Sequence, residues 1–258
     1  MDAFERLEKA RALERTLKPM ELDPLRAKLA PQITVALTDL QAVLAAAPDL
    51  PEALILSGRL AIQLGSRDDE AEGRLKRAAE LGSSAAWAQL GHFYRAHARA
   101  PAATEAYRKA LESDPGSAES WYGLAVLAQL QKNWEAAADA ALKALERRPD
   151  LQEAFFIVRG ISRAPEKTRA VQKPPARAFC MGLAAVEAGS ESKAAKLFES
   201  SLESYPDLAL AHLGMGMGSS GPARSKALFR ALELAPLNPD VNLEWARLAL
   251  DKEDCETA

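Results

Sequence analysis

The chain has little of what would point to a sheet protein, a secreted protein or a membrane protein. Only 6% of its 258 residues are aromatic. Alanine and leucine dominate instead, which is typical of closely packed helices. No run of about 18 apolar residues occurs, so we expect no transmembrane helix. The N-terminal segment mixes acidic and basic residues and has no apolar stretch, so we expect no secretory signal.

Cysteine and net charge are low as well. Cys180 and Cys255 are far apart in the sequence and do not have the spacing of metal ligands. We interpret both as reduced thiols and expect a cytoplasmic protein. The formal net charge is −3, which argues against a nucleic-acid binder, because such a protein needs a large basic surface.

Motifs for catalysis or cofactor binding are also missing. Residues 216–221 read GMGSSG, which matches the glycine-rich dinucleotide fingerprint, but a helical pattern precedes them where the fingerprint needs a strand. His92, His97 and His212 do not have the four-residue spacing of paired metal ligands on a helix. We therefore expect no metal, no cofactor and no enzymatic activity.

What the sequence does have is a repeat of 34 residues. Trp87 and Trp121 are separated by 121 − 87 = 34 residues, and Pro115 and Pro149 by 149 − 115 = 34 residues. Each copy also has a small residue four positions after its tryptophan; these residues are Gly91 and Ala125. The period and the residue order resemble the tetratricopeptide repeat, in which two antiparallel helices form one unit. The two clearest copies are residues 84–117 and 118–151.

The resemblance implies an all-α fold, a right-handed α-solenoid of about six antiparallel helix pairs. A helix pair cannot bury its apolar face alone and packs against its neighbours. The small residues let the two helices of a pair approach, and the prolines end the second helix. We expect Gly91 to lie at such a close contact and Ala88 to face an open groove.

The pattern divides the chain into five parts. We expect an N-terminal cap or degenerate repeat over residues 1–50, and three regular repeats over 51–151. A degenerate, shortened repeat with a basic segment follows over 152–174, then two further repeats over 175–236. Residues 237–258 are expected to form a C-terminal capping helix and a polar tail, since solenoids need a cap on their last apolar face.

The resemblance implies a protein–protein interaction scaffold that binds a peptide or protein partner in the concave groove. The alternative is a self-assembling or regulatory helical subunit, including a homo-oligomer, that serves an enzyme or complex in trans. Some relatives hold acidic C-termini with lysine and asparagine side chains from successive first helices. The corresponding positions here lack those residues, so this chain does not match the carboxylate-clamp type.

Analogy with the family places one set of residues in the groove. These residues are Arg59, His92, Arg95, Tyr122, Val126, Phe156, Phe179, Leu213 and Met217. We expect the three aromatic residues among them to form a stripe, and His92 and Arg95 to hold a carboxylate or a carbonyl. The ligand would then be a peptide with apolar anchors and an acidic residue. Alternatively, some of these aromatics pack against the irregular 152–174 unit and only brace the bend.

The irregular unit carries an excess of basic residues. Arg159 stands where a small residue is expected, and five more basic residues follow: Arg163, Lys167, Arg169, Lys173 and Arg177. One interpretation is a solvated, shortened repeat that bends the solenoid. The other is a basic patch that docks an acidic partner surface.

Overall fold

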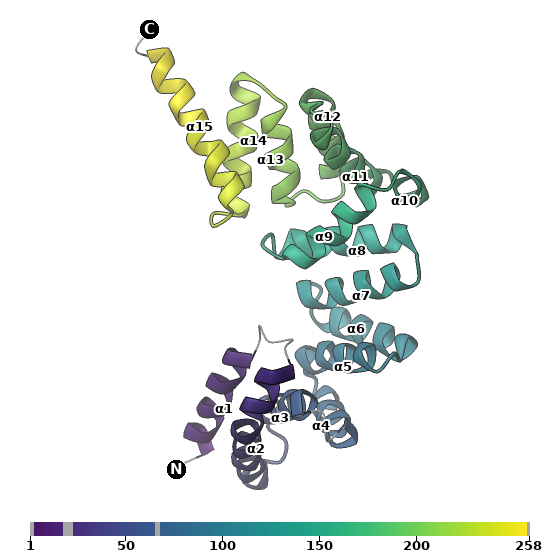
Figure 1. Cartoon of the computed structure of the whole chain (residues 1–258), viewed down its shortest axis with the longest axis vertical. Coiled ribbons are helices and arrows are strands. Elements are labelled where there is room, and N and C mark those ends of the chain that lie inside the picture. Colours follow the sequence, from purple (N-terminus) through teal and green to yellow (C-terminus); the bar gives the residue numbers. More distant parts are fainter. Residues whose placement is uncertain (1–2, 18–22, 65–67, 257–258) are drawn as a thin grey trace. The chain divides into compact units, whose positions relative to one another are not determined.

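A computed structural model describes residues 3–17, 23–64 and 68–256, and these ranges form fifteen α-helices and no strand (Figure 1). Fourteen of the helices follow one another as pairs, and a single helix comes last. The predicted all-α fold of consecutive helix pairs is confirmed. In the ranges that the model describes, no helix combines the length and apolar character needed to cross a membrane.

The chain divides into two compact units, Met1–Pro115 and Gly116–Ala258. The first unit holds α1 (Ala3–Leu17), α2 (Asp23–Ala46), α3 (Pro51–Leu64), α4 (Asp68–Glu80), α5 (Ser84–Ala96) and α6 (Ala100–Ser113). The second holds α7 (Ala118–Leu130), α8 (Trp134–Arg147), α9 (Gln152–Ser162), α10 (Pro165–Ala170), α11 (Pro174–Glu187), α12 (Glu191–Leu202), α13 (Ala209–Met217), α14 (Gly221–Leu234) and α15 (Pro239–Glu256). The five-part division of the chain into repeats and caps stays a prediction.

Small residues set the distance between the helices of a pair. A Cβ atom on Gly91 of α5 would lie 2.5 Å from the Tyr107 ring of α6. A Cβ atom on Gly182 of α11 would lie 2.8 Å from the Phe198 ring of α12. Both distances are shorter than a van der Waals contact, so a larger residue at either position would force the helices apart. Gly91 therefore lies at a close helix–helix contact, as expected.

The pair α9–α10 departs from this arrangement because its second helix is short. α10 has 6 residues, whereas α8 has 14. α11 consequently packs against α8 and α9 as well as against α10 and α12. The core of the second unit continues through this region, where Val158, Val171 and Phe179 are fully buried.

Candidate protein-interaction site

An open pocket lies between the first helices α7 and α9 of the second unit. Its volume is about 320 Å³, and its walls are Tyr122, Val126 and Gln129 of α7 and Glu153, Phe156 and Ile157 of α9. On each helix these residues follow the spacing of a single face. The structure thus brings together three residues that the sequence analysis assigned to the groove, namely Tyr122, Val126 and Phe156.

The pocket is mostly apolar, and one large side chain stands in solvent. Tyr122 and Val126 are half-buried and pack against the core of the unit, and Ile157 is buried. Phe156, in contrast, is 59% exposed. Leu130, the last residue of α7, comes four positions after the pocket residue Val126 and is 71% exposed. Exposed apolar side chains that share one surface mark interaction sites more often than isolated ones do.

Charges are distributed unevenly along α9. Glu153 lines the pocket in the first turn of the helix and makes no ion pair with another described residue. Toward the other end, Arg163 and Arg159 both donate to Glu187 of α11, at 2.9 and 3.2 Å. Hydrogen bonds from Arg163 and Arg159 hold the pKa of Glu187 below its usual value despite some desolvation. The pocket end of α9 therefore presents an acidic group, while the basic groups at the other end are partly neutralised.

Gly160 of α9 lies three and four residues beyond the pocket residues Ile157 and Phe156, so it is on the same helix face. It is exposed, and a Cβ atom added to it would meet nothing within 4 Å. Unlike Gly91, it is not required by packing within the fold. The absence of a side chain leaves the α9 backbone accessible beside the pocket.

The predicted groove residues of the first unit are half-buried, and the ring of one of them, His92, contacts its own helix pair. Arg59 and Arg95 are half-buried in α3 and α5. His92 Nδ1 lies 3.0 Å from the Tyr107 hydroxyl, and the two rings meet edge to face. The expectation that Ala88 faces an open groove is wrong, because Ala88 is only 4% exposed.

Two groove predictions in the second unit are wrong as well. Phe179 is fully buried, with its ring centroid 5.4 Å from that of Phe198. Its ring therefore packs toward α12, the second helix of its own pair, and belongs to the core of the second unit. Leu213 is buried in a cluster with residues of α14 and α15, and Met217 packs against the same cluster. Phe179 is therefore a core residue, and the alternative that aromatic residues brace the irregular unit stays a prediction.

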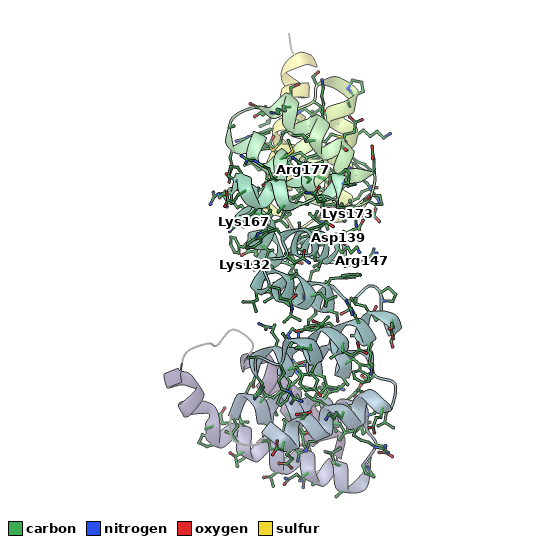
Figure 2. All side chains as sticks on the ribbon, turned by 90° about the vertical axis from the view of Figure 1, so that its right-hand side faces the viewer. Lys132, Asp139, Arg147, Lys167, Lys173 and Arg177 are labelled. Carbon is green, nitrogen blue, oxygen red and sulfur yellow. The ribbon has the colours of Figure 1, made fainter. Side chains whose placement is uncertain are left out.

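Three residues of the basic segment are engaged in internal contacts (Figure 2). Lys173 Nζ lies 2.5 Å from Asp139 Oδ1, and Lys167 Nζ lies 4.7 Å from the centroid of the Trp134 ring. Arg163 pairs with Glu187. Arg169 is exposed and Arg177 is half-buried. These contacts support the interpretation of a shortened, braced repeat, and a docking role for the segment stays a prediction without support from the geometry.

The brace that joins α8 to the start of α11 was not anticipated. Glu135 Oε2 accepts hydrogen bonds from the backbone N–H groups of Gln172 and Lys173, at 2.7 and 3.1 Å. Asp139 Oδ1 accepts a 2.6 Å hydrogen bond from the hydroxyl of buried Tyr205. Burial alone would raise the pKa of Asp139, but hydrogen bonds from Lys173 and Tyr205 outweigh burial and lower it. Burial and the Asp139 hydrogen bond raise the pKa of Tyr205.

The described residues do not form an arrangement of side chains that is typical of a catalytic or metal site. No group of three histidine, cysteine, aspartate or glutamate side chains there could hold a metal ion. Cys180 is buried, and burial raises the pKa of its thiol to about 12. A thiol with so high a pKa is a poor nucleophile near neutral pH.

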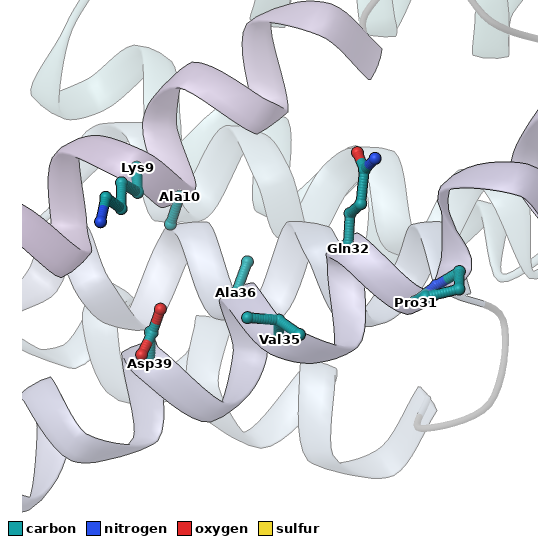
Figure 3. A pocket seen from close by; sticks show the side chains of 7 residues that line it. All are labelled: Lys9, Ala10, Pro31, Gln32, Val35, Ala36 and Asp39. Atoms are coloured by element: carbon teal, nitrogen blue, oxygen red, sulfur yellow. The ribbon is translucent and has the colours of Figure 1, made fainter.

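A second pocket lies between α1 and α2 of the first unit (Figure 3). The sequence analysis did not predict it. Its volume is about 370 Å³, and it is lined by Lys9, Ala10, Pro31, Gln32, Val35, Ala36 and Asp39. Val35 is 64% exposed. The only signal in the sequence is the four-residue spacing of Pro31 and Val35, which places both on one helix face.

Comparison with known proteins identifies the repeat. The family model of the tetratricopeptide repeat matches residues 84–127. No curated protein matches the chain. The matched segment spans α5, α6 and most of α7, which form the first of the two clearest copies and the start of the second. Other pairs repeat the small-residue contact of Gly91.

Solved structures with a similar arrangement of helices include MamA and a tetratricopeptide repeat protein from Parabacteroides merdae. MamA is 21% identical, with 71% of this chain and 95% of that chain covered and a TM-score of 0.43. The Parabacteroides protein is 15% identical, with 89% and 96% covered and a TM-score of 0.44. TM-scores this low carry no information about partners. Residues 84–127 thus match the tetratricopeptide repeat family, and the helix pairs before and after them continue the same two-helix arrangement.

Proposed function

We propose that the chain is an interaction scaffold whose second unit binds a peptide segment of a protein partner at the pocket between α7 and α9. The observation that carries this proposal is Phe156, which is 59% exposed although it lines a pocket next to the half-buried Tyr122. Aromatic side chains bury large areas on binding at a low cost in conformational entropy, and they dominate many interfaces.

The pocket favours an apolar anchor beside a basic residue. Tyr122, Val126 and Phe156 offer apolar contacts, and Glu153 offers a carboxylate that no described residue neutralises. A lysine or arginine next to the anchor of the peptide would pair with Glu153. This proposal replaces the acidic peptide expected from the sequence, because that expectation depended on His92, whose ring is held by Tyr107.

Gly160 supports a close approach of the ligand backbone. Glycine within a helix costs roughly 0.5–1 kcal/mol relative to alanine, and no packing contact within the fold requires one at this position. A ligand whose backbone crosses α9 beside Phe156 would require a residue without a side chain at this position. Gly73 of α4 is similar, since a Cβ atom there also meets nothing within 4 Å. Gly73 belongs to the first unit and does not line this pocket, so it serves as a control.

The test is selection from a random peptide library displayed on phage, with the wild-type chain as bait. We expect enriched peptides that share an apolar residue next to lysine or arginine. In Gly160→Gln a side chain projects beside the pocket, so binding of these peptides should fall at least tenfold. Gly73→Gln should bind them like the wild type.

Two results would contradict the proposal. One is enrichment of peptides that bind Gly160→Gln and the wild type equally well. The other is a set of peptides whose shared residues are acidic. Circular dichroism melting curves of both glutamine variants show whether each variant is folded before its binding is compared.

A further inference from the structure

The helix α15 packs one of its faces onto the second unit. Asn238 caps it, because its side-chain oxygen accepts hydrogen bonds from the backbone N–H groups of Asp240 and Val241, at 3.0 and 3.2 Å. Val241 and Leu248 are buried against residues of α13 and α14. This part of α15 covers the end of the preceding pair, as a capping helix does.

The register of the repeat identifies α15 as a first helix. In three other first helices, α5, α7 and α13, a small, buried residue stands eight positions after the N-cap and faces the second helix of the same pair. These N-cap and small residues are Ser83 and Gly91, Ser117 and Ala125, and Leu208 and Gly216. Eight positions after Asn238 comes 238 + 8 = 246, which is Ala246.

Ala246 has no second helix against it in the part of the chain that the model describes. It is exposed, whereas Ala125 is 0% exposed. Leu243 and Leu250 share its helix face and are 51% and 61% exposed. The face of α15 that corresponds to a pairing face is therefore apolar and open to solvent. The sequence analysis assigned a cap to residues 237–258, and an end cap normally turns a polar face outward.

We propose that this face, defined by Leu243, Ala246 and Leu250, pairs with the same face of α15 in a second copy of the chain. The two helices run antiparallel about a two-fold axis. Each copy then supplies a helix that packs on the open face of α15 in the other copy. This partner differs from the peptide of the α7–α9 pocket, and the proposal does not depend on that pocket.

The spacing of the three residues favours a second copy over another occupant. Leu243 lies three residues before Ala246 and Leu250 four residues after it. Antiparallel pairing places Leu243 of one copy opposite Leu250 of the other, and both leucines fill the space above the small residue. A two-fold interface requires this kind of self-complementary surface. Arg247, at the edge of the face, already pairs with Glu244 of its own helix, so pairing buries no uncompensated charge.

The proposed interface is small, and its size limits the expected affinity of the dimer. Stable interfaces bury about 800 Å² on each partner, and a single helix face offers less. We therefore expect a weak dimer that dissociates on dilution, not a permanent one.

Sedimentation velocity over a hundredfold range of concentration tests the proposal. The wild type should shift from monomer to dimer and no further. Leu243→Glu combined with Leu250→Glu should raise the dissociation constant at least tenfold. The control, Leu130→Glu with Phe156→Glu, places two charges on exposed apolar residues of the α7–α9 surface and should leave dimerisation unchanged. A wild type that stays monomeric, grows beyond a dimer or dimerises equally well as the α15 variant would overturn the proposal.

Disulfide trapping tests the register independently of stability. In a Cys255→Ser background, Ala246→Cys lies next to the two-fold axis and should give a covalent dimer under mild oxidation. Lys226→Cys, at an exposed position of α14 outside this face, should remain monomeric. Cys180 is buried and serves as the unreactive background thiol. Equal cross-linking of both variants, or of neither, would rule out this pairing.

Discussion

The pairs α7–α8 and α9–α10 lie next to each other in the same unit and differ at one key position. In α7 the position that faces the second helix is Ala125, which is fully buried beneath α8. In α9 it is Arg159, whose side chain is 40% exposed and pairs with Glu187. The 14 residues of α8 cover their first helix, whereas the 6 residues of α10 do not. A long side chain is tolerated where the second helix is too short to cover it.

The second difference concerns what holds each pair in place. α7 and α8 pack mainly through small apolar residues. The region after α9 depends in addition on polar contacts with α8, in which Asp139 binds Lys173 and Tyr205. The same shortening accompanies the exposure of Phe156, whereas Tyr122, the equivalent residue of α7, is half-buried. The irregular pair thus combines a polar brace with a surface that is available to a partner.

The largest effect is expected when Ala125 of α7 is replaced by arginine, the residue at the equivalent position of α9. Ala125→Arg puts a charge without a partner at a fully buried position, which costs about 3–5 kcal/mol. We expect a large fall in the urea midpoint or failure to fold. A variant that is as stable as the wild type would show that α8 does not constrain this position.

Asp139→Ala removes the centre of the brace. It leaves the hydroxyl of buried Tyr205 without its hydrogen-bond acceptor, and an unsatisfied buried group costs about 1–3 kcal/mol. Urea unfolding followed by circular dichroism should show this loss. Lys143→Ala is the matched control, because Lys143 contacts the same carboxylate at 3.2 Å from the more exposed side. A loss in Lys143→Ala as large as in Asp139→Ala would contradict the assigned role of Tyr205.

The brace also predicts an acid dependence. The folded-state pKa of Asp139 is lowered, so its contribution to stability is present above the unfolded value of about 3.9. It is lost as the pH falls below that value toward the folded pKa. The difference in stability between the wild type and Asp139→Asn should therefore shrink as the pH is lowered from about 4. A difference that stays constant as the pH falls would contradict the lowered pKa.

A smaller effect of opposite sign, a gain in the stability of the fold, is expected when Gly160 is replaced. Gly160→Ala meets no neighbouring atom and should stabilise the fold by about 0.5–1 kcal/mol, because it reduces the freedom of the unfolded chain. Gly91→Ala is the contrasting variant, because its Cβ atom would lie 2.5 Å from Tyr107. Thermal melting should rank Gly160→Ala above the wild type and Gly91→Ala below it. The reverse ranking would contradict the distinction between the two glycines.

The smallest effect is expected for Arg159→Ala. Its ion pair with Glu187 is largely solvent-exposed, and such pairs contribute about 0–1 kcal/mol. The melting temperature should change little, in contrast to Ala125→Arg at the equivalent position. A large loss would show that Arg159 packs against its neighbours more than its exposure indicates.

The sequence was sufficient for the helix pairs and for the close contact at Gly91, because both follow from a local period of 34 residues. It was not sufficient for Phe179 and Leu213, because Phe179 contacts Phe198 of α12 and Leu213 is buried with residues of α14 and α15. The Asp139–Tyr205 hydrogen bond joins residues 66 positions apart, and no periodicity predicts such a pair. The cytoplasmic location stays a prediction.

The most direct test of the α7–α9 pocket is the affinity of one selected peptide, labelled with fluorescein and titrated by anisotropy. Three proteins are compared: the wild type, Phe156→Ala, and Phe229→Ala, which truncates a 50% exposed phenylalanine of α14. We predict that Phe156→Ala weakens binding at least tenfold, or about 1.4 kcal/mol, while Phe229→Ala leaves it unchanged. Equal affinity for the wild type and a folded Phe156→Ala would contradict the proposal that this pocket is the binding site.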